Sequence, residues 1–449
     1  MSRYLYTLHD YHAIKKASIP IEGITVLAGI NGSGKSTLSK WLYYIVNGAS
    51  NFDTYLYRNF ASEVINILRH YDQLHRDINV SPATQTRLQN SHFFREALSK
   101  AQQYIYDEAE IDNLEDIYQK TLQRFSVMLT VYLNLSKGNI NSRKERLLSY
   151  IGIDESLYTT IDELVSAFIK TENIEIEELK RKYLLEKENR EQKKFYDVIR
   201  HRYTILEETP NNINLEEDGV KLFRKEKVGN LFNLSYAIYI DTPLATSGNN
   251  GTMNNVFWWD LRRKMDNPQK GYEASLEVRK LSQRIKNIIH GKVILKKNDF
   301  EENELHFLRE DGLEIKIEDA ATGMKSFSYI LRLLENGYLD DKTLLMIDEP
   351  EAHLHPQWII EFARILVLLQ KELKVKILID SHNPDMVAAL QSIASKENVI
   401  DNLHFYLAKP IKEGAFNYEF VEQGKSIEGI FESFNMAYQK IKQYGDSSL

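Results

Sequence analysis

A glycine-rich segment near the start of the chain carries residues whose types and spacing fit a known chemistry. Residues 29–36 read GINGSGKS and satisfy the pattern G-x-x-x-x-G-K-[ST] at every specified position. In this pattern the backbone N–H groups surround the phosphates of a nucleotide, Lys35 reaches the terminal phosphates, and the Ser36 hydroxyl binds Mg²⁺. The residues predicted to bind the nucleotide are Gly29, Asn31, Gly32, Ser33, Gly34, Lys35, Ser36 and Thr37.

The flanking sequence supplies the context that this motif requires. Residues 24–28 form a short apolar, β-rich run, and residues 37–47 have apolar side chains at helical spacing. Gly48 follows at a position typical of a helix end. A polar hairpin loop is the alternative, but the order of strand, loop and helix favours nucleotide binding.

A second apolar run ends in two adjacent acidic residues. Residues 343–350 read TLLMIDEP, which predicts a buried strand that ends at Asp348 and Glu349. An aspartate at this end of a parallel strand can hold Mg²⁺ through water beside Ser36, and the next glutamate can act as general base on the attacking water. The alternative is a solvated loop after a core strand. The occurrence of this acidic pair together with a phosphate-binding loop favours the catalytic interpretation.

A third predicted strand, residues 376–379, is followed by the segment DSHNP. His382 would therefore lie at the carboxyl edge of a parallel sheet, where open α/β folds bind their ligands. Its imidazole could donate a hydrogen bond to the γ-phosphate or orient the attacking water. A histidine at a strand end is more often structural, but its position after the acidic pair favours a catalytic role.

The composition excludes several classes of chemistry. The 449 residues include no cysteine, which excludes disulfides, thiol catalysis, thiolate zinc sites and iron–sulfur clusters. No apolar run approaches the roughly 18 residues that span a bilayer, so we expect a soluble, cytoplasmic protein without membrane contact. The net charge of −7 does not predict a dedicated nucleic-acid binder, although it leaves room for a local basic groove.

The predicted secondary structure changes in character twice along the chain. Residues 1–48 and 219–449 alternate strands and helices and are expected to form one discontinuous α/β ATPase domain with a parallel sheet, which includes a strand meander near 293–317. Residues 49–218 read as a helical insertion, without a heptad repeat long enough for an extended coiled coil. Its predicted helices are 59–78, 90–108, 114–135 and 161–203. The mixed charges at 174–194 are typical of a solvated helix face.

These motifs together resemble the ABC-type ATPases, in the soluble branch that includes SMC-like repair proteins, RecF, OLD and the PtuA-like ATPases of Septu and retron-associated anti-phage defence. The resemblance covers the first 48 residues and about 220–449. It rests on IEGITVLAGINGSGKSTLSK, DEPEAHLHP and DSHNP, where Ser381 replaces the usual threonine. It implies a P-loop head, made of a parallel sheet and an antiparallel β lobe, that hydrolyses ATP with Mg²⁺ through Glu349, His382 and Lys35.

The signature segment of this family has a partial counterpart at residues 320–325, AATGMK. Gly323 matches its second glycine, whereas Ala321 occupies the serine position and no Q-loop glutamine is evident. A helix that starts near Lys325 would direct its N-terminus at a phosphate. In the family, the signature of one subunit completes the ATP site of the other. The resemblance therefore implies a homodimer or higher oligomer with ATP between two heads.

The resemblance also indicates what the ATPase would control. It implies a separate effector protein such as a nuclease, or engagement of nucleic acid, in anti-phage defence or DNA repair. A nucleotide-binding subunit of a membrane transporter and a scaffold that binds ATP without hydrolysis are the alternatives. Three further motifs are weaker: His353 and His355 as metal ligands, Trp258 and Trp259 as a stacking platform, and Tyr11 as an adenine contact.

Overall fold

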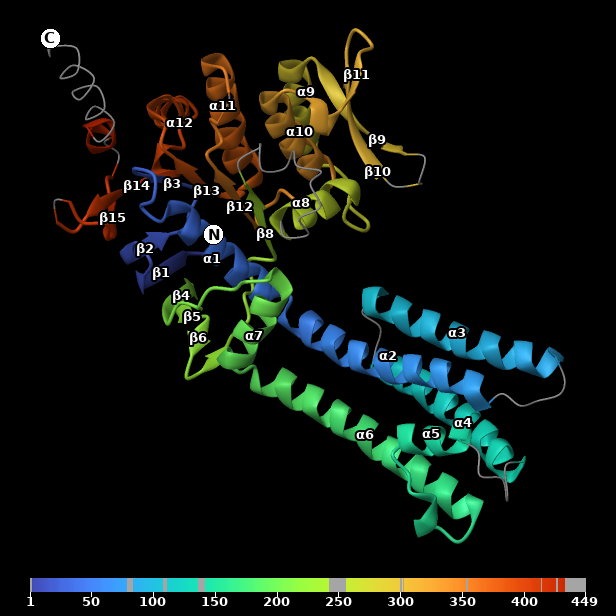
Figure 1. Cartoon of the computed structure of the whole chain (residues 1–449). Helices are drawn as coiled ribbons and strands as arrows, with labels where there is room; N and C mark the ends of the chain where they lie inside the picture. Colours follow the sequence, from blue (N-terminus) through green and yellow to red (C-terminus); the bar gives the residue numbers. More distant parts are fainter. Residues whose placement is uncertain are drawn as a thin grey trace, which may run out of the picture. The chain divides into compact units, whose positions relative to one another are not determined.

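We analysed a computed structural model of the chain, which describes residues 2–78, 84–107, 111–135, 142–241, 256–298, 301, 303–352, 354–412, 414–424 and 427–432. The chain divides into two compact units. One consists of residues 1–50 and 195–449, and the other of residues 51–194. Both units are drawn in Figure 1.

The first unit is built on a ten-stranded sheet with the order β5-β4-β1-β2-β15-β14-β3-β13-β12-β8. Strands β14, β3, β13, β12 and β8 run parallel to one another, and β1, β2, β4 and β5 form an antiparallel end. Between them, β15 is antiparallel to β14 and parallel to β2. The strands are β1 (Tyr4–Tyr11), β2 (Ile14–Pro20), β3 (Ile24–Ala28), β4 (Asn212–Glu217), β5 (Val220–Lys221), β8 (Tyr236–Ile240), β12 (Thr343–Asp348), β13 (Lys376–Ser381), β14 (Leu403–Pro410) and β15 (Tyr418–Glu422).

The central strands are buried at every position, because helices cover both faces of the sheet. β3, β12 and β13 accordingly read as continuous apolar runs rather than alternating ones. Helix α1 packs on one face, while α11 and α12 lie on the other (Figure 1). The helices of this unit are α1 (Lys35–Ser50), α7 (Gln192–Tyr203), α8 (Val256–Asp266), α9 (Leu276–Ile289), α10 (Thr322–Glu335), α11 (Pro356–Leu373) and α12 (Pro384–Lys396).

The smaller elements of this unit include the strand meander predicted near 293–317. It is a three-stranded antiparallel sheet in the order β11-β10-β9. The bounds are β9 (Gly291–Lys297), β10 (Asn303–Arg309), β11 (Glu314–Lys316), β6 (Phe223–Arg224), β7 (Lys227–Val228), and the 3-10 turns η2 (Ile317–Asp319) and η3 (Ile400–Asn402). Helix α8 was not predicted from the sequence.

Gly48 does not end the first helix, contrary to the prediction. It lies inside α1, which continues to Ser50. A Cβ atom at Gly48 would lie 2.7 Å from Cδ1 of Ile199 and 2.9 Å from Cζ of Phe195. The glycine is therefore required by the close approach of α7 to α1, a contact that the local sequence does not reveal.

We expect the substitution Gly48→Val to destabilise the protein. Its branched side chain would overlap the buried rings and methyl groups of α7, and overpacking of this kind costs about 1–3 kcal/mol. Urea denaturation should show this loss in the free energy of unfolding. Gly48→Ala, with a single added carbon and a better helix propensity, should cost less. Equal stability of the valine variant and the wild type would contradict the packing shown here.

The second unit is helical. Its elements are α2 (Phe52–Ile78), α3 (Thr84–Asp107), α4 (Ile111–Leu135), α5 (Ser142–Tyr150), η1 (Glu155–Leu157) and α6 (Ile161–Asn189). Helices α2, α4 and α6 share a core that contains Tyr71, Tyr118, Phe125 and Phe168. Tyr118 donates a hydrogen bond to the carbonyl of Glu172 on α6 at 2.9 Å, and Tyr71 hydrogen-bonds the Glu172 carboxylate.

Two boundaries differ from the sequence predictions. The helix expected over 161–203 is divided in two, because Arg190 adopts a left-handed conformation (φ 46°) and ends α6. The insertion expected over 49–218 corresponds to a compact unit of residues 51–194. Residues 195–218 belong to the sheet unit instead, since α7 packs on α1 and β4 pairs with β1.

Candidate nucleotide-binding site

The phosphate-binding motif lies between a buried strand and a helix, as the sequence predicted. β3 ends at Ala28, and α1 begins at Lys35. Gly32 and Gly34 have φ values of 80° and 96°, a region that side chains with a Cβ rarely adopt. A Cβ at Gly34 would also lie 2.6 Å from Cγ1 of Ile14. Both the turn and the close approach of β2 therefore require glycine at position 34.

The Lys35 side chain points back into the loop. Its ammonium donates hydrogen bonds to the carbonyls of Gly29 at 2.8 Å and of Ile30 at 3.1 Å. Burial lowers the pKa of Lys35, although the nearby carboxylates of Asp380 and Asp348 oppose the shift. The lysine is thus placed inside the loop, where phosphate oxygens would have to replace the two carbonyls.

A pocket of about 370 Å³ opens over this loop. It is lined by His12, Ala13, Asn31, Gly32, Ser33, Gly34, Lys35, Ser36, Thr37, Glu207 and Glu349. The structure therefore brings most of the predicted loop residues together with the predicted base, Glu349. Gly323 does not line this pocket.

His12 and Glu207 also line the pocket, and neither was predicted from the sequence. The Nε2 atom of His12 lies 3.4 Å from the Glu207 carboxylate. The neighbouring Tyr11, considered as an adenine contact, is buried and donates a hydrogen bond to the carbonyl of Glu208 at 2.8 Å. Its ring also meets Trp41 edge to face, so Tyr11 packs in the fold rather than presenting a free face.

Asp348 and Ser36 meet at the edge of the sheet. Asp348 ends β12, and its carboxylate accepts a hydrogen bond from the Tyr239 hydroxyl at 3.0 Å. Burial raises the pKa of Asp348. The Ser36 hydroxyl lies near enough to favour the ionised form of Asp348 and so to oppose this rise in its pKa. Mg²⁺ prefers oxygen ligands and is commonly held by one or two protein groups together with phosphates and waters. The paired hydroxyl and carboxylate oxygens fit such an ion.

Asp380 lies beside Asp348 because the two residues are register partners on β13 and β12. Its two carboxylate oxygens accept hydrogen bonds from the Ser39 hydroxyl at 2.9 and 2.8 Å. Burial, and then the charge of Asp348, raise the pKa of Asp380 well above its usual range. Asp380 was not predicted to have a role, although it directly precedes the Ser381-His382 pair at the same strand end.

Glu349 and His382 contact each other at the same edge. The Nδ1 atom of His382 lies 3.1 Å from the Glu349 carboxylate, and both side chains remain partly exposed. The backbone N–H of Glu349 donates a hydrogen bond to the carbonyl of Asp380 at 2.9 Å. The residue predicted as general base and the histidine predicted to be catalytic are therefore in direct contact.

Glu351 supports this pair through hydrogen bonds to the segment that carries His382, and it was not predicted from the sequence. Its side chain is buried, and one carboxylate oxygen accepts hydrogen bonds from the Ser381 hydroxyl at 2.8 Å and from the backbone N–H of His382 at 3.2 Å. Burial raises the pKa of Glu351. The available signal was its place in the acidic segment DEPE, two residues after the proposed base.

We expect Glu351→Ala to lower ATP hydrolysis by roughly tenfold while ATP binding changes little. Without the carboxylate, the loop that carries His382 loses two hydrogen bonds, and a misplaced group near the reacting atoms reduces kcat. Steady-state kinetics and a nucleotide titration would separate the two effects. Glu351→Gln keeps one accepting oxygen and should retain more activity, and Glu361→Ala on the exposed side of α11 serves as the control. An unchanged kcat for Glu351→Ala would contradict this role.

The candidate signature segment forms the start of α10. Ala321 precedes the helix and provides no side-chain cap. A Cβ at Gly323 would lie 2.8 Å from Cε3 of Trp358 and 3.1 Å from Cδ2 of Leu354, so this glycine permits close packing against α11 and the segment before it. The Lys325 ammonium donates to the carbonyl of Glu318 at 2.6 Å and holds the first turn of α10 onto η2.

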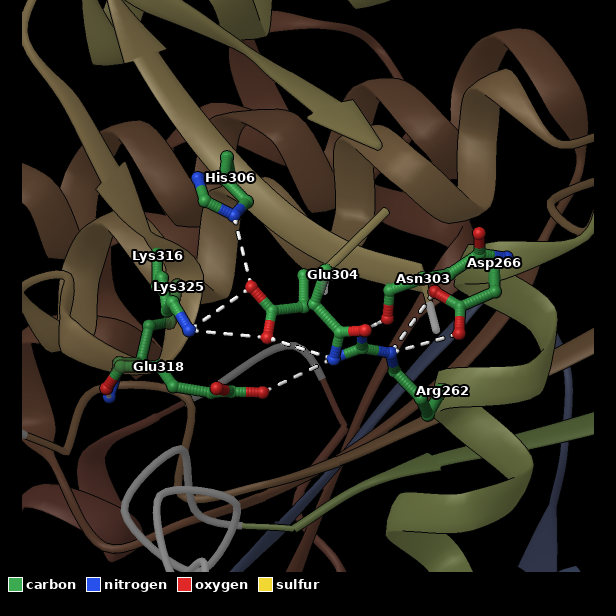
Figure 2. A network of polar contacts seen from close by, with 9 residues as sticks. Arg262, Asp266, Asn303, Glu304, His306, Lys316, Glu318 and Lys325 are labelled. Carbon is green, nitrogen blue, oxygen red and sulfur yellow. Dashed lines mark hydrogen bonds and ion pairs between the residues drawn. The ribbon is translucent and has the colours of Figure 1, made fainter. Parts of the chain in front are cut away.

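A network of charged side chains connects this segment to α8 and to the small sheet (Figure 2). Arg262 of α8 binds Asp266, the carbonyl of Asn303 at 2.6 Å, and the Glu318 carboxylate at 3.3 Å. Glu304 binds Lys316 and His306 on the same sheet. The network fixes η2, and through η2 the position of α10.

The remaining motifs have structural explanations where they are described. The His355 side chain caps α11 by accepting from the N–H of Gln357, and His353 lies outside the described residues. Within the described part of the chain, no group of three or more His, Cys, Asp or Glu side chains is arranged to hold a metal ion. Trp258 packs against the core, whereas Trp259 is 63% exposed, so the two tryptophans do not act as one unit.

No helix among the described residues is both long enough and apolar enough to cross a membrane.

Comparison with known proteins identifies a family. The AAA ATPase domain family matches residues 7–387 of the chain. No curated protein sequence matches it. Among solved structures, the Smc head domain of Pyrococcus furiosus, with an extended coiled coil and bound to the C-terminal domain of ScpA, aligns with 98% of this chain and 100% of its own, at 13% identity and a TM-score of 0.33. The SMC head domain of Thermotoga maritima aligns with 48% of this chain and 66% of its own, at 14% identity and a TM-score of 0.26.

Proposed function

The chain belongs to the AAA ATPase domain family, and we propose that it binds ATP with Mg²⁺ and hydrolyses it at the carboxyl edge of the large sheet. The observation that carries this proposal is the convergence of the phosphate-binding loop with Asp348, Glu349 and His382 at one edge of the sheet. Comparing ATP hydrolysis by the wild type and by Glu349→Gln tests it.

Each residue has a distinct part in the proposed reaction. Lys35 leaves the two loop carbonyls and binds the terminal phosphates, while loop N–H groups bind the others. Ser36 and Asp348 would hold Mg²⁺, which when bound neutralises charge that develops on the phosphate oxygens. Glu349 accepts a proton from the attacking water. His382 orients Glu349 through Nδ1, and its other ring nitrogen is left for the γ-phosphate.

We propose further that the reaction takes place between two heads of a homodimer. Gly323 does not line the pocket over the phosphate-binding loop of its own chain, and α10 begins without a side-chain cap for its N–H groups. A phosphate from a second copy could accept hydrogen bonds from those groups. This assignment follows the ABC-type pattern of the SMC, RecF and OLD branch.

The proposed biological role is control of a partner by ATP. The resemblance to PtuA-like ATPases supports anti-phage defence with a separate effector such as a nuclease, and the wider branch supports engagement of nucleic acid in DNA repair. The alternative of a scaffold that binds ATP without hydrolysis is favoured by one observation, the alanine at position 321 in place of the signature serine. A measurement of ATP turnover distinguishes the ATPase from the scaffold.

A further inference from the structure

Helix α6 presents an exposed groove of mixed apolar and charged residues on the side opposite its buried face. Its buried residues are Leu164, Val165, Phe168, Ile176 and Tyr183. On the other side, Ile174, Leu184 and Leu185 are each about half exposed, at 51%, 46% and 49%. They lie in a groove of about 890 Å³, and the described residues that line it all belong to α6. A mixed apolar and charged face of this size is suited to binding another helix.

The residues along the middle of this groove follow the seam spacing of paired helices. They alternate between steps of four and three residues and are Lys170, Ile174, Glu177, Arg181, Leu184 and Glu188. None of the four charged residues makes an ion pair within the part of the chain that the structure describes. Lys180 at the border of the groove differs, because it binds Glu115 of α4 at 2.6 Å.

We call these six residues the seam. When a second copy of the helix is reversed, the charges of its seam are complementary to those of the first. About a centre at Leu179, Lys170 lies as far on one side as Glu188 on the other, Ile174 as far as Leu184, and Glu177 as far as Arg181. An antiparallel second copy of α6 would therefore place opposite charges against each other at four places and an apolar pair at two. A two-fold axis repeats every contact.

Other arrangements of the same two helices are unfavourable. A parallel pair would place each charged residue against its own copy. Sliding an antiparallel partner by seven residues in one direction opposes Lys170 with Arg181, and in the other direction opposes Glu177 with Glu188. Like charges in direct opposition disfavour an interface, so the seam specifies one register.

We propose that α6 binds α6 of a second copy of this chain, antiparallel and centred on Leu179. This contact goes beyond the proposed ATPase function, since it uses the helical unit and needs no nucleotide. It gives the mixed charges at 174–194, interpreted from the sequence as a solvated face, a specific partner.

A charge exchange tests the pairing in the full chain without nucleotide. Analytical ultracentrifugation of the wild type should show concentration-dependent association. Glu177→Arg and Arg181→Glu should each weaken it by about tenfold or more, because each places like charges together twice in the dimer. The double variant should restore affinity to near the wild-type value. Lys182→Glu, exposed on another side of α6, is the matched control, and circular dichroism verifies that the helix content is unchanged.

The absence of cysteine in the chain allows a second test, of the register. Positions 174 and 184 of one helix lie about 15 Å apart along its axis, too far for a disulfide within one chain. In the proposed pair, position 174 of one copy meets position 184 of the other. Ile174→Cys combined with Leu184→Cys should therefore give a covalent dimer on oxidation, and either single variant should not.

The outcomes decide the proposal. A monomeric wild type at every concentration, a double charge variant as weak as the single ones, or equal cross-linking by the single cysteine variants would each overturn it. If the wild type is monomeric, the groove binds a different partner or is simply solvated. None of these results depends on ATP binding, so the proposed ATPase function stands or falls separately.

Discussion

The Glu349→Gln variant is expected to lose ATP hydrolysis by about 100-fold or more while it still binds ATP. A general base contributes on the order of 10²–10⁴ to a rate, and glutamine cannot accept the proton of the attacking water. Glutamine keeps the size of the side chain and can still meet Nδ1 of His382, so the binding pocket should remain. The measurement is phosphate release under saturating ATP, together with a nucleotide titration.

The same variant reports on the dimer. If ATP lies between two heads, slow hydrolysis should trap the nucleotide-bound dimer, and sedimentation should show it with ATP and Mg²⁺ but not without. Glu372→Gln, on the exposed side of α11, is the control for a general effect of lost charge. A variant that turns over ATP as fast as the wild type would exclude Glu349 as the base. Wild-type protein that binds ATP but is no faster than the variant would favour the scaffold.

The Lys35→Ala variant is expected to weaken ATP binding by on the order of 100-fold. Lys35 is buried in the loop, and its replacement removes charge-assisted hydrogen bonds to phosphate that are worth about 1.5–3 kcal/mol. A fluorescent ATP analogue or calorimetry would measure the change in Kd. Lys16→Ala removes an exposed lysine from β2 of the same unit and serves as the matched control.

The Lys35→Ala substitution also affects the phosphate-binding loop itself. Replacing Lys35 leaves the carbonyls of Gly29 and Ile30 without their present hydrogen-bond donor, so the melting temperature of the variant should be measured in parallel. Unchanged ATP affinity in a folded Lys35→Ala protein would contradict the assignment of the phosphate-binding loop.

The sequence predicted the central elements of the site because their signals are local. The loop motif, the apolar runs that became β12 and β13, and the acidic pair after β12 each lie within a few consecutive residues. Parallel strands end at the same edge, and this rule was sufficient to place Asp348 and His382 in one region of the fold.

The residues that sequence reasoning missed depend on contacts between distant segments. Asp380 lies beside Asp348 only because β12 and β13 pair in one particular register, and Glu351 reaches Ser381 across the same edge. Gly48 was interpreted as a helix end because the close approach of Phe195 and Ile199 is not visible in the neighbouring residues. The division of the long helix at Arg190 likewise had no glycine or proline to mark it.

The backbone of Glu349 has a consequence for stability. Its φ of 47° places a residue with a full side chain in a left-handed conformation, which costs of order 1–3 kcal/mol. The conformation of the proposed base therefore lowers the free energy of unfolding, and selection for stability alone would not favour it. Glycine or asparagine at this position would relieve it and would remove the carboxylate, so stability and turnover are set in opposition at a single residue.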